Sequence, residues 1–311
     1  MTNANIIEVI ERFPSAGPSP IWKPEINEAA NIFMKSKRSL KNCEAAFNLV
    51  ELGVVVTCAG ILALLVLPAL AADKLQSAST GCLYNLRHLQ TGCAIYSAEN
   101  NDYLMPNSSL AAPAPNTWCG NEIEGWGNSD ANTNPVVYKN ALLWPYLGNN
   151  LSAFRCPGDT VPSANGYRIR SYSMNGQMGD EYSAVQSITE SANPGYLTYA
   201  KESDVIRPTP ANAFVFADES PETIEDGYLE ISSSGQSVTS YGYFPNVPAC
   251  YLEGACGFSF ADGHAEIHRW QTAALLIPVQ QGVSINYRIQ PNGGPGNADW
   301  IWFTQHAASH Q

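Results

Sequence analysis

A run of 21 residues without a charge constrains this chain more than any other feature. It extends from Leu52 to Ala72 and reads LGVVVTCAGILALLVLPALAA. About 20 apolar residues in a helix are enough to cross the ~30 Å hydrocarbon core of a bilayer. A core helix of a soluble protein rarely stays apolar on every face over such a length. The run therefore predicts a transmembrane helix.

The distribution of charge predicts the orientation of this helix. Residues 1–46 carry six Lys or Arg and five Asp or Glu, and the remainder carries ten and 23. Basic residues beside a membrane helix stay in the cytoplasm, so we expect a cytoplasmic N-terminus and an acidic domain outside. The net charge of −12 argues against nucleic acid as a partner. The basic residues nearest the apolar run all precede it: Lys35, Lys37, Arg38 and Lys41.

A cleaved secretory signal is the alternative interpretation of the apolar run. Residues 69–71, Ala-Leu-Ala, have the small-x-small form that signal peptidase accepts. The run is, however, much longer than the 7–15 apolar residues of such a signal. Glu51, at its edge, would have no purpose there.

Two residues of the segment are unusual for a plain membrane anchor. Glu51 lies at the cytoplasmic edge of the run, where an ionisable group usually has a partner. Pro68 lies inside the run and leaves the Leu64 carbonyl without its normal helical donor. Without any assembly role, Glu51 would be an interfacial acid and Pro68 one of the prolines tolerated in membrane helices.

Together with Phe47, these residues resemble the type IV prepilin and type II secretion pseudopilin family. Residues 46–51, AFNLVE, match its small residue followed by Phe and, four residues later, Glu, and Pro68 matches its helix-kinking proline. The resemblance implies that a prepilin peptidase cuts between Ala46 and Phe47 and methylates the new amino group. It also implies that Glu51 pairs with the Phe47 amine of a neighbouring subunit during assembly. The family usually has Gly where this chain has Ala46.

The resemblance also divides the chain. Residues 1–46 are the expected leader, residues 47–72 the transmembrane half of the N-terminal helix, and residues 73–311 the exported pilin-like domain. A leader of 46 residues is long for this family. Met34 begins MKSKRSLKNCEAA, a short basic leader of the usual kind, so we expect translation to start there. A genuinely extended cytoplasmic leader is the alternative.

Eight cysteines fit an exported domain with disulfide bonds. Cys43 precedes the apolar run and Cys58 lies within it, which leaves six in the domain. Six thiols permit 15 complete pairings. Cys82 and Cys93 cannot pair with each other, because eleven helical residues separate them by ~16 Å. Since the chain has no C-x2-C pair, zinc ranks well behind disulfides. The six are Cys82, Cys93, Cys119, Cys156, Cys250 and Cys256.

The pattern of the exported part predicts an α+β domain. Apolar residues recur every three or four positions through 73–99, which predicts that the helix continues to about Glu99, before a turn at residues 100–102. Residues 103–135 are predicted to be a surface loop and 141–148 a short helix ended by Gly148. The segment 154–159 is predicted to contain a strand that ends at Pro157. Residues 213–218 and 257–262 are predicted to be neighbouring antiparallel strands, with 264–270 as the return strand of a hairpin. The stretch after 270 has no clear assignment.

The order of these segments resembles one branch of the family more specifically. These are the large pseudopilin-G-like proteins of planctomycete and verrucomicrobial type, which have a C-terminal Asp-Gly motif. The resemblance rests on the Cys82-x-x-Asn-Leu-Arg helix motif and on FRCPGD, RSYSMN, FVFADE and FSFADGH, and covers most of residues 46–270. It implies a pilin-like fold with a long N-terminal transmembrane helix packed on an antiparallel sheet with long loops. It also implies a Cys82–Cys156 disulfide. Cys250 and Cys256 bracket a five-residue loop that a second disulfide would close.

Three acidic residues and two histidines are the candidates for enzymatic or metal-binding chemistry in this sequence. Carboxylates beside a histidine can act as general acid and base, and several carboxylates can hold calcium, which the pseudopilin G relatives bind in a C-terminal loop. The calcium ligands of those relatives have no residue-by-residue match here. Turn geometry and ordinary surface positions explain the group better, so we expect no enzyme. The group comprises Asp218, Glu219, Asp262, His264 and His268.

The sequence thus predicts a pseudopilin-like subunit that polymerises through its N-terminal helix in a type II secretion system or related fibre. It would be a single-pass inner-membrane protein with its C-terminal domain in the periplasm. Its partners would be other copies of itself, the prepilin peptidase and the inner-membrane secretion machinery. The alternative function is a monomeric exported or signal-anchored ligand-binding domain.

Overall fold

The structure is a computed structural model that describes residues 48–107, 117–120, 123–179, 195–231, 242–273, 275–276, 279–281, 288–289 and 295–309. The chain divides into two compact units, residues 1–60 and 61–311. The described part of the first unit consists of Asn48 and the first turns of helix α2, Leu49–Glu99. The second unit contains the rest of α2 and all the described strands.

Helix α2 begins with a side-chain cap and ends where the sequence predicted. The Asn48 amide donates to a carboxylate oxygen of Glu51 at 3.1 Å, and the Val50 amide donates to the Asn48 side chain at 3.2 Å. This reciprocal pattern satisfies amides that a helix N-terminus otherwise leaves free. At the other end, the helix gives way to a turn at Asn100, with Asn101 and Asp102 in the left-handed conformation.

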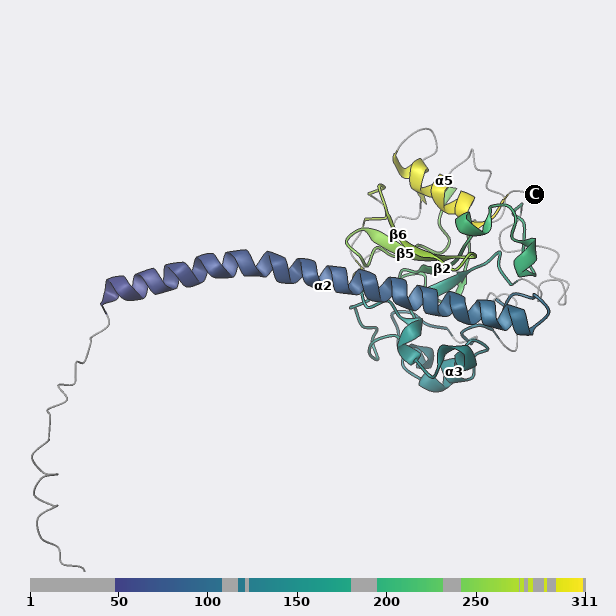
Figure 1. Cartoon of the computed structure of the whole chain (residues 1–311), viewed down its shortest axis with the longest axis horizontal. Coiled ribbons are helices and arrows are strands. Elements are labelled where there is room, and N and C mark those ends of the chain that lie inside the picture. Colours follow the sequence, from purple (N-terminus) through teal and green to yellow (C-terminus); the bar gives the residue numbers. More distant parts are fainter. Residues whose placement is uncertain are drawn as a thin grey trace, which may run out of the picture. The chain divides into compact units, whose positions relative to one another are not determined.

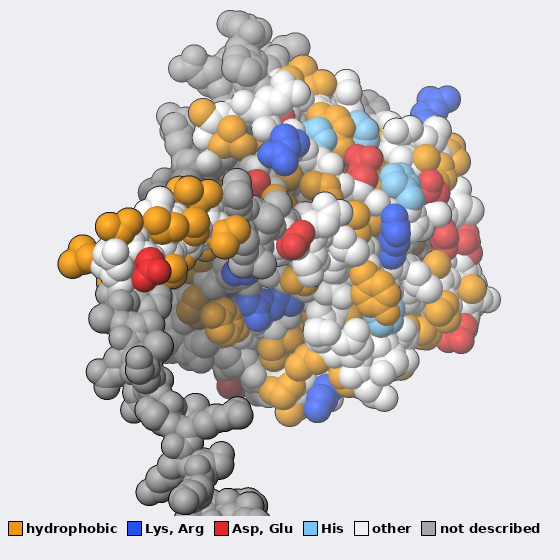
Figure 2. Space-filling view, turned by 60° about the vertical axis from the view of Figure 1, so that its left-hand side comes forward, with side chains coloured by type: hydrophobic (Ala, Val, Ile, Leu, Met, Phe, Trp, Pro, Cys, Tyr) orange, Lys and Arg blue, Asp and Glu red, His pale blue; other side chains and the backbone are white. Residues whose placement is uncertain are grey.

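The first part of α2 carries large apolar side chains that are exposed. Hydrophobic atoms cover the corresponding end of the helix in Figure 2. Within the described ranges, none of the helices combines the length and the apolarity needed to cross a bilayer. The side chains of 65, 66 and 68–72, within the apolar run, lie outside the described residues. The exposed residues are Leu49, Val50, Leu52, Val54, Val55, Val56, Ile61, Leu62, Leu64 and Leu67.

The second unit is built on a five-stranded sheet in the order β3-β1-β2-β5-β6. The predicted antiparallel pairing of β2 with β5 and the hairpin of β5 with β6 are confirmed. The expectation of a purely antiparallel sheet is wrong, because β3 pairs with β1 in parallel and makes the sheet mixed. The strands are β1 (Tyr172–Asn175), β2 (Phe214–Asp218), β3 (Tyr228–Leu229), β5 (Ala255–Phe260) and β6 (Ala265–Arg269).

Two helices cover opposite faces of this sheet, as Figure 1 shows. Successive side chains of a strand point to opposite faces, so neighbouring residues of β5 identify what covers each face. A Cβ at Gly257 would lie 2.6 Å from the Cys82 sulfur of α2. The next residue, Phe258, instead packs on Trp302 of helix α5 (Pro295–Ala307), with ring centroids 5.0 Å apart. The core therefore has three layers: α2, the sheet and α5.

The buried face of α2 follows the predicted periodicity. Cys82, Leu86, Leu89 and Cys93 are all at most 3% exposed, whereas Tyr84 on the opposite face is 63% exposed. Spacings of three and four residues place these four side chains on one side of the helix. This half of α2 is therefore a core helix of the domain.

Two predicted segments differ in the structure. Residues 154–159 form no strand, because the 3-10 helix η3 (Leu151–Phe154) is followed by a turn. The predicted surface loop around Trp118 and Cys119 is wrong at these two residues, which are 0% and 2% exposed. Trp118 packs its ring edge-on against Phe216 of β2, with centroids 4.9 Å apart. The aromatic side chain draws this loop into the core, since burying it removes a large apolar surface from water.

The remaining elements are short. The predicted short helix before Gly148 is confirmed as the 3-10 helix η2 (Trp144–Leu147), which Gly148 ends in the left-handed conformation. Strands β4 (Gly242–Tyr243) and β7 (Arg288–Ile289) form a separate antiparallel pair. The other short elements are α3 (Pro135–Lys139) and the 3-10 helices η1 (Asp130–Asn132), η4 (Glu202–Asp204) and η5 (Pro210–Asn212).

Candidate functional site

The predicted assembly residues lie at the beginning of α2. Glu51 is exposed in the first turn of the helix, where its carboxylate accepts the Asn48 amide. Ala46 and Phe47, the predicted cleavage and methylation site, lie outside the described residues. Pro68 lies within α2, and its side chain is outside the description.

The carboxylate and histidine residues considered for catalysis or calcium do not form one site. Asp218 and Glu219 are fully buried and contact different groups. Asp262 and His264 lie together in the β5–β6 turn, where the His264 ring nitrogen is 2.5 Å from an Asp262 oxygen. His268 stacks on Trp302, with ring centroids 3.6 Å apart. These five residues therefore occupy separate environments.

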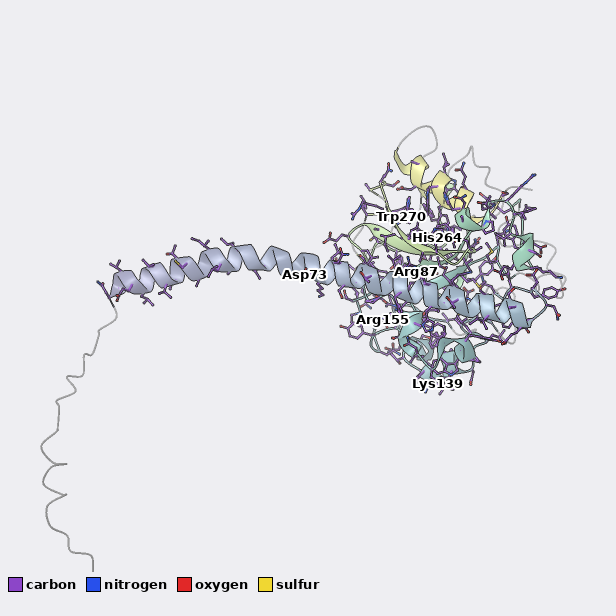
Figure 3. The ribbon with its side chains drawn as sticks, viewed as in Figure 1. Asp73, Arg87, Lys139, Arg155, His264 and Trp270 are labelled. Carbon is purple, nitrogen blue, oxygen red and sulfur yellow. The ribbon has the colours of Figure 1, made fainter. Side chains whose placement is uncertain are left out.

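Three of the histidines nonetheless lie on or beside β6 and α5. Figure 3 marks His264 and Trp270, the two residues that flank β6. His268 and His306 of α5 stack on Trp302, with His306 at a centroid distance of 4.3 Å. These contacts are aromatic packing between β6 and α5, which accounts for the histidines without any chemical role.

The structure does bring together two thiols and a carboxylate at the interface of α2 with the sheet. The sulfur atoms of Cys82 and Cys156 and a carboxylate oxygen of Asp218 all lie within 4.8 Å of one another. Cys82 comes from α2, Cys156 follows η3, and Asp218 ends β2. All three side chains are 0% exposed. We refer to Cys82, Cys156 and Asp218 as the thiol–carboxylate cluster.

Asp218 is held by weak donors, and none of the described Lys or Arg side chains forms an ion pair with it. The Cys82 thiol donates to its Oδ2 at 3.1 Å, the Gly257 amide donates to Oδ2 at 3.3 Å, and the Ser171 hydroxyl donates to Oδ1 at 3.4 Å. Burial raises the pKa of Asp218 to about 7, although the thiol and amide donors oppose the shift. Desolvation thus dominates at this carboxyl.

Burial acts on the two thiols in the same direction. It raises the pKa of Cys82 well above its usual value, and a contact with Cys156 adds to the shift. Burial likewise raises the pKa of Cys156. Since the thiolate is the reactive and metal-binding form, burial by itself disfavours reaction at either thiol.

Small residues make room for the cluster. A Cβ at Gly257 would lie 2.6 Å from the Cys82 sulfur and 3.2 Å from the Asp218 carboxylate. A Cβ at Gly158 would lie 3.4 Å from the Cys156 sulfur, and the Gly158 amide donates to that sulfur at 3.4 Å. A side chain at position 257 would therefore clash with the thiol–carboxylate cluster.

The disulfides implied by the family resemblance stay predictions. Cys82 and Cys156 lie together, but as free thiols. Burial raises the pKa of Cys256 well above its usual value, and the charges of Asp218 and Cys156, followed by Cys250, add to the shift. A disulfide between Cys250 and Cys256 stays a prediction from their spacing.

An open cavity of about 1260 Å³ lies next to the cluster, between α2 and the loops that follow η3. Cys156 is one of its lining residues. Arg168, fully buried, lines it as well and donates to Asp159 at 2.8 Å while its guanidinium lies 5.0 Å from the centre of the Trp126 ring. Figure 3 marks Arg155, another lining residue. The cavity connects the surface with the neighbourhood of Cys156.

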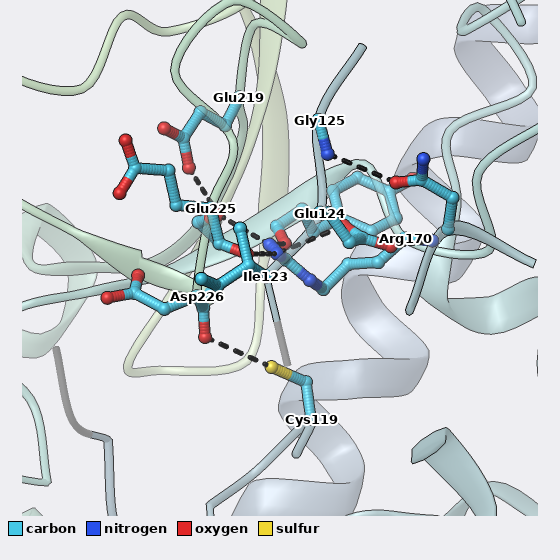
Figure 4. Close-up of polar contacts among 12 residues, drawn as sticks. Cys119, Ile123, Glu124, Gly125, Arg170, Glu219, Glu225 and Asp226 are labelled. Carbon is cyan, nitrogen blue, oxygen red and sulfur yellow. Dashed lines mark hydrogen bonds and ion pairs between the residues drawn. The ribbon is translucent and has the colours of Figure 1, made fainter. Parts of the chain in front are cut away.

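A second buried polar group surrounds Arg170, which precedes β1 (Figure 4). The guanidinium pairs with the Glu124 carboxylate at 3.0 Å and donates to the Ser173 hydroxyl at 2.9 Å. Ser173 in turn donates to Glu219 at 2.5 Å. The neighbouring carboxylates, Glu124 first, raise the pKa of Arg170 against the opposing effect of burial. The group is an ion-pair network within the core.

Sequence reasoning missed this network. Arg170 and Ser173 belong to the RSYSMN segment, which the family resemblance had already singled out. An arginine directly before a strand of buried residues is the available signal, because a buried guanidinium requires a carboxylate partner. Its partner Glu124, 46 residues earlier, has no signal of its own.

No protein-family model matches the chain, and neither the curated proteins nor the solved structures include a significant match.

Proposed function

We propose that this chain is a pseudopilin-like structural subunit that polymerises through its N-terminal helix in a type II secretion system or a related fibre. The observation that carries the proposal is the contrast along α2. Leu86 and Leu89 in its second half are fully buried in the domain, whereas large apolar side chains from Leu49 to Leu67 are exposed. Exposed apolar surface of this extent requires a lipid or protein partner.

Glu51 supports assembly more than simple anchoring. It adjoins the uncharged run of 52–72, and within the described part of the chain its carboxylate accepts a hydrogen bond from the Asn48 amide. A carboxylate at the edge of a membrane requires a partner. In the proposed fibre, the methylated amine of Phe47 from a neighbouring subunit provides that partner. The leader is removed by a prepilin peptidase, and the domain faces the periplasm.

Replacement of Glu51 tests this proposal. Glu51→Gln keeps an acceptor for the Asn48 amide, since Glu and Gln both serve at this capping position. It removes the charge, so we expect it to abolish fibre assembly while membrane insertion persists. Asp73→Asn, an exposed acid on the same helix, should assemble normally. Cross-linking of subunits in membranes measures assembly, and normal fibres from Glu51→Gln would remove the charge-pairing argument.

The cavity favours one alternative, a monomeric exported or signal-anchored ligand-binding domain. Its volume of about 1260 Å³ is sufficient for a small molecule. N-terminal sequencing of the mature chain separates the two functions. Methylated Phe47 supports the fibre subunit, a start at Ala72 supports a secreted domain, and an uncut chain supports a signal anchor.

A further inference from the structure

We propose that the thiol–carboxylate cluster of Cys82, Cys156 and Asp218 is a zinc site. Zinc binds thiolates at about 2.3 Å and carboxylate oxygens at about 2.0–2.2 Å in a tetrahedral arrangement. Ligand atoms around such an ion are then roughly 3.5–4 Å apart. The three ligand atoms lie within 4.8 Å of one another, so small side-chain adjustments accommodate the ion.

The chemical type of the ligand atoms determines which metal ions the cluster favours. Two sulfurs favour a borderline or soft ion over calcium or magnesium, which prefer oxygen ligands. The bound ion replaces the thiol protons of Cys82 and Cys156, and both protons leave to solvent. Asp218 completes the set as a carboxylate at one end of β2. A dipositive ion then offsets two of the three negative charges of this ligand set, and none of the described Lys or Arg side chains forms an ion pair with Asp218.

The hydrogen bonds of Asp218 argue against a disulfide between Cys82 and Cys156. Joining Cys82 to Cys156 would remove the thiol that donates to Asp218 at 3.1 Å. The carboxylate would keep the Gly257 amide at 3.3 Å and the Ser171 hydroxyl at 3.4 Å, both long hydrogen bonds. A fully buried carboxylate left with so few donors is costly. A metal ion turns the same carboxylate into a ligand.

The surroundings are those of a metal site with one open position. The Gly158 amide donates to the Cys156 sulfur at 3.4 Å, and the Tyr172 hydroxyl donates to the Cys82 sulfur at 3.4 Å. Such outer donors orient thiolate ligands and tune their charge. Because Cys156 lines the adjoining cavity, the ion has a route of entry, and water can fill the fourth position.

Metal titration of the full-length chain in detergent, with its thiols reduced, tests the proposal. We expect one Co²⁺ per chain, with thiolate-to-cobalt charge-transfer absorption that Zn²⁺ abolishes. Cys82→Ser, Cys156→Ser and Asp218→Asn should each weaken binding at least about 10-fold, since even outer-shell changes cost 10–100-fold. Cys93→Ser, another buried cysteine on α2, is the matched control and should bind like the wild type.

A second measurement requires no variant. Zn²⁺ should protect Cys82 and Cys156 from alkylation in the wild-type chain but leave exposed Cys58 reactive, as read by peptide mass spectrometry. Alkylation unchanged by Zn²⁺ would overturn the proposal, as would a Cys82–Cys156 disulfide in chains quenched with acid directly from cells. Fibre assembly is scored separately, so failure of the zinc site and failure of the proposed function are distinguishable.

Discussion

At the scale of single residues, a network of buried charged groups surrounds Arg170 in the core. The Arg170 side chain is 1% exposed and reaches Glu124 directly and Glu219 through Ser173. A buried ion pair contributes little net stability by itself, but breaking it leaves an uncompensated charge. The network therefore makes the fold sensitive to the loss of any one partner.

Arg170→Met should lower the free energy of unfolding by about 3–5 kcal/mol, because it leaves Glu124 buried without its cation. Urea denaturation of the purified chain measures the effect. Arg87→Met, at an exposed arginine on α2 (Figure 3), should change the free energy by no more than about 0.5 kcal/mol.

The double variant Arg170→Met with Glu124→Gln separates lost charge from lost packing. Glutamine keeps an acceptor for the Tyr138 hydroxyl, which donates to Glu124. If uncompensated charge dominates, the double variant should be more stable than Arg170→Met alone. A double variant no more stable than the single one would show that hydrogen bonding and packing of the guanidinium dominate instead.

Glu230, half-buried after β3, predicts a pH dependence of stability. Burial, with repulsion from Asp226 and Glu225, raises its pKa from 4.5 to about 7. The folded state holds the extra proton between these values, so this group's contribution to stability is lost as the pH rises from about 4.5 to 7. Glu230→Gln should flatten that decline, measured as unfolding free energy at pH 5, 6, 7 and 8. Glu266→Gln, exposed on β6, should keep the wild-type slope, and an equal slope for Glu230→Gln would contradict the assignment.

At the scale of elements, α2 serves two different environments with one continuous helix. From Cys82 to Cys93 its buried side chains recur every three or four residues, as a helix on a sheet requires. From Leu49 to Leu67 the exposed apolar residues surround the helix on all sides. Periodicity alone therefore separates the packed part of the helix from the part that requires another partner.

Leu86→Ala tests the packed part. Leu86 is 0% exposed, and a Cβ added at Gly257 of β5 would lie 2.7 Å from it. Truncation leaves a cavity between α2 and the sheet, so the free energy of unfolding should fall by about 2–5 kcal/mol. Tyr84→Ala removes a larger side chain that is 63% exposed on the same helix and should cost about 0.5 kcal/mol or less. Equal losses in urea denaturation would mean that α2 packs differently.

At the scale of the whole molecule, the proposed function depends on how the beginning of α2 is accommodated. Leu62 is 61% exposed and lies in the middle of the uncharged run. Leu62→Arg should weaken membrane insertion, because a charge at the centre of a membrane helix costs about 2.5–3.5 kcal/mol. Alkaline extraction of membranes measures the fraction that stays integral. Tyr84→Arg should extract like the wild type, and an unchanged fraction for Leu62→Arg would argue against a membrane location.

The local sequence pattern was sufficient to predict several elements of the fold. The end of α2 at Glu99, the pairing of β2 with β5 and the β5–β6 hairpin follow from periodicity and from an Asp-Gly turn. It was not sufficient for β1 and β3, whose parallel pairing joins residues 54 apart, such as Met174 and Tyr228. The local pattern also did not predict helix α5, because its run of aromatic residues is equally compatible with a strand.

The uncharged run, the charge asymmetry around it and the α+β character were determined by the sequence alone, because each depends on residues close together in the chain. The thiol–carboxylate cluster was decided by the tertiary structure. It joins Cys82, Cys156 and Asp218 across 136 residues, through the packing of α2 on the sheet. A contact between such distant residues depends on which faces of the elements are buried together, and no local pattern carries that information.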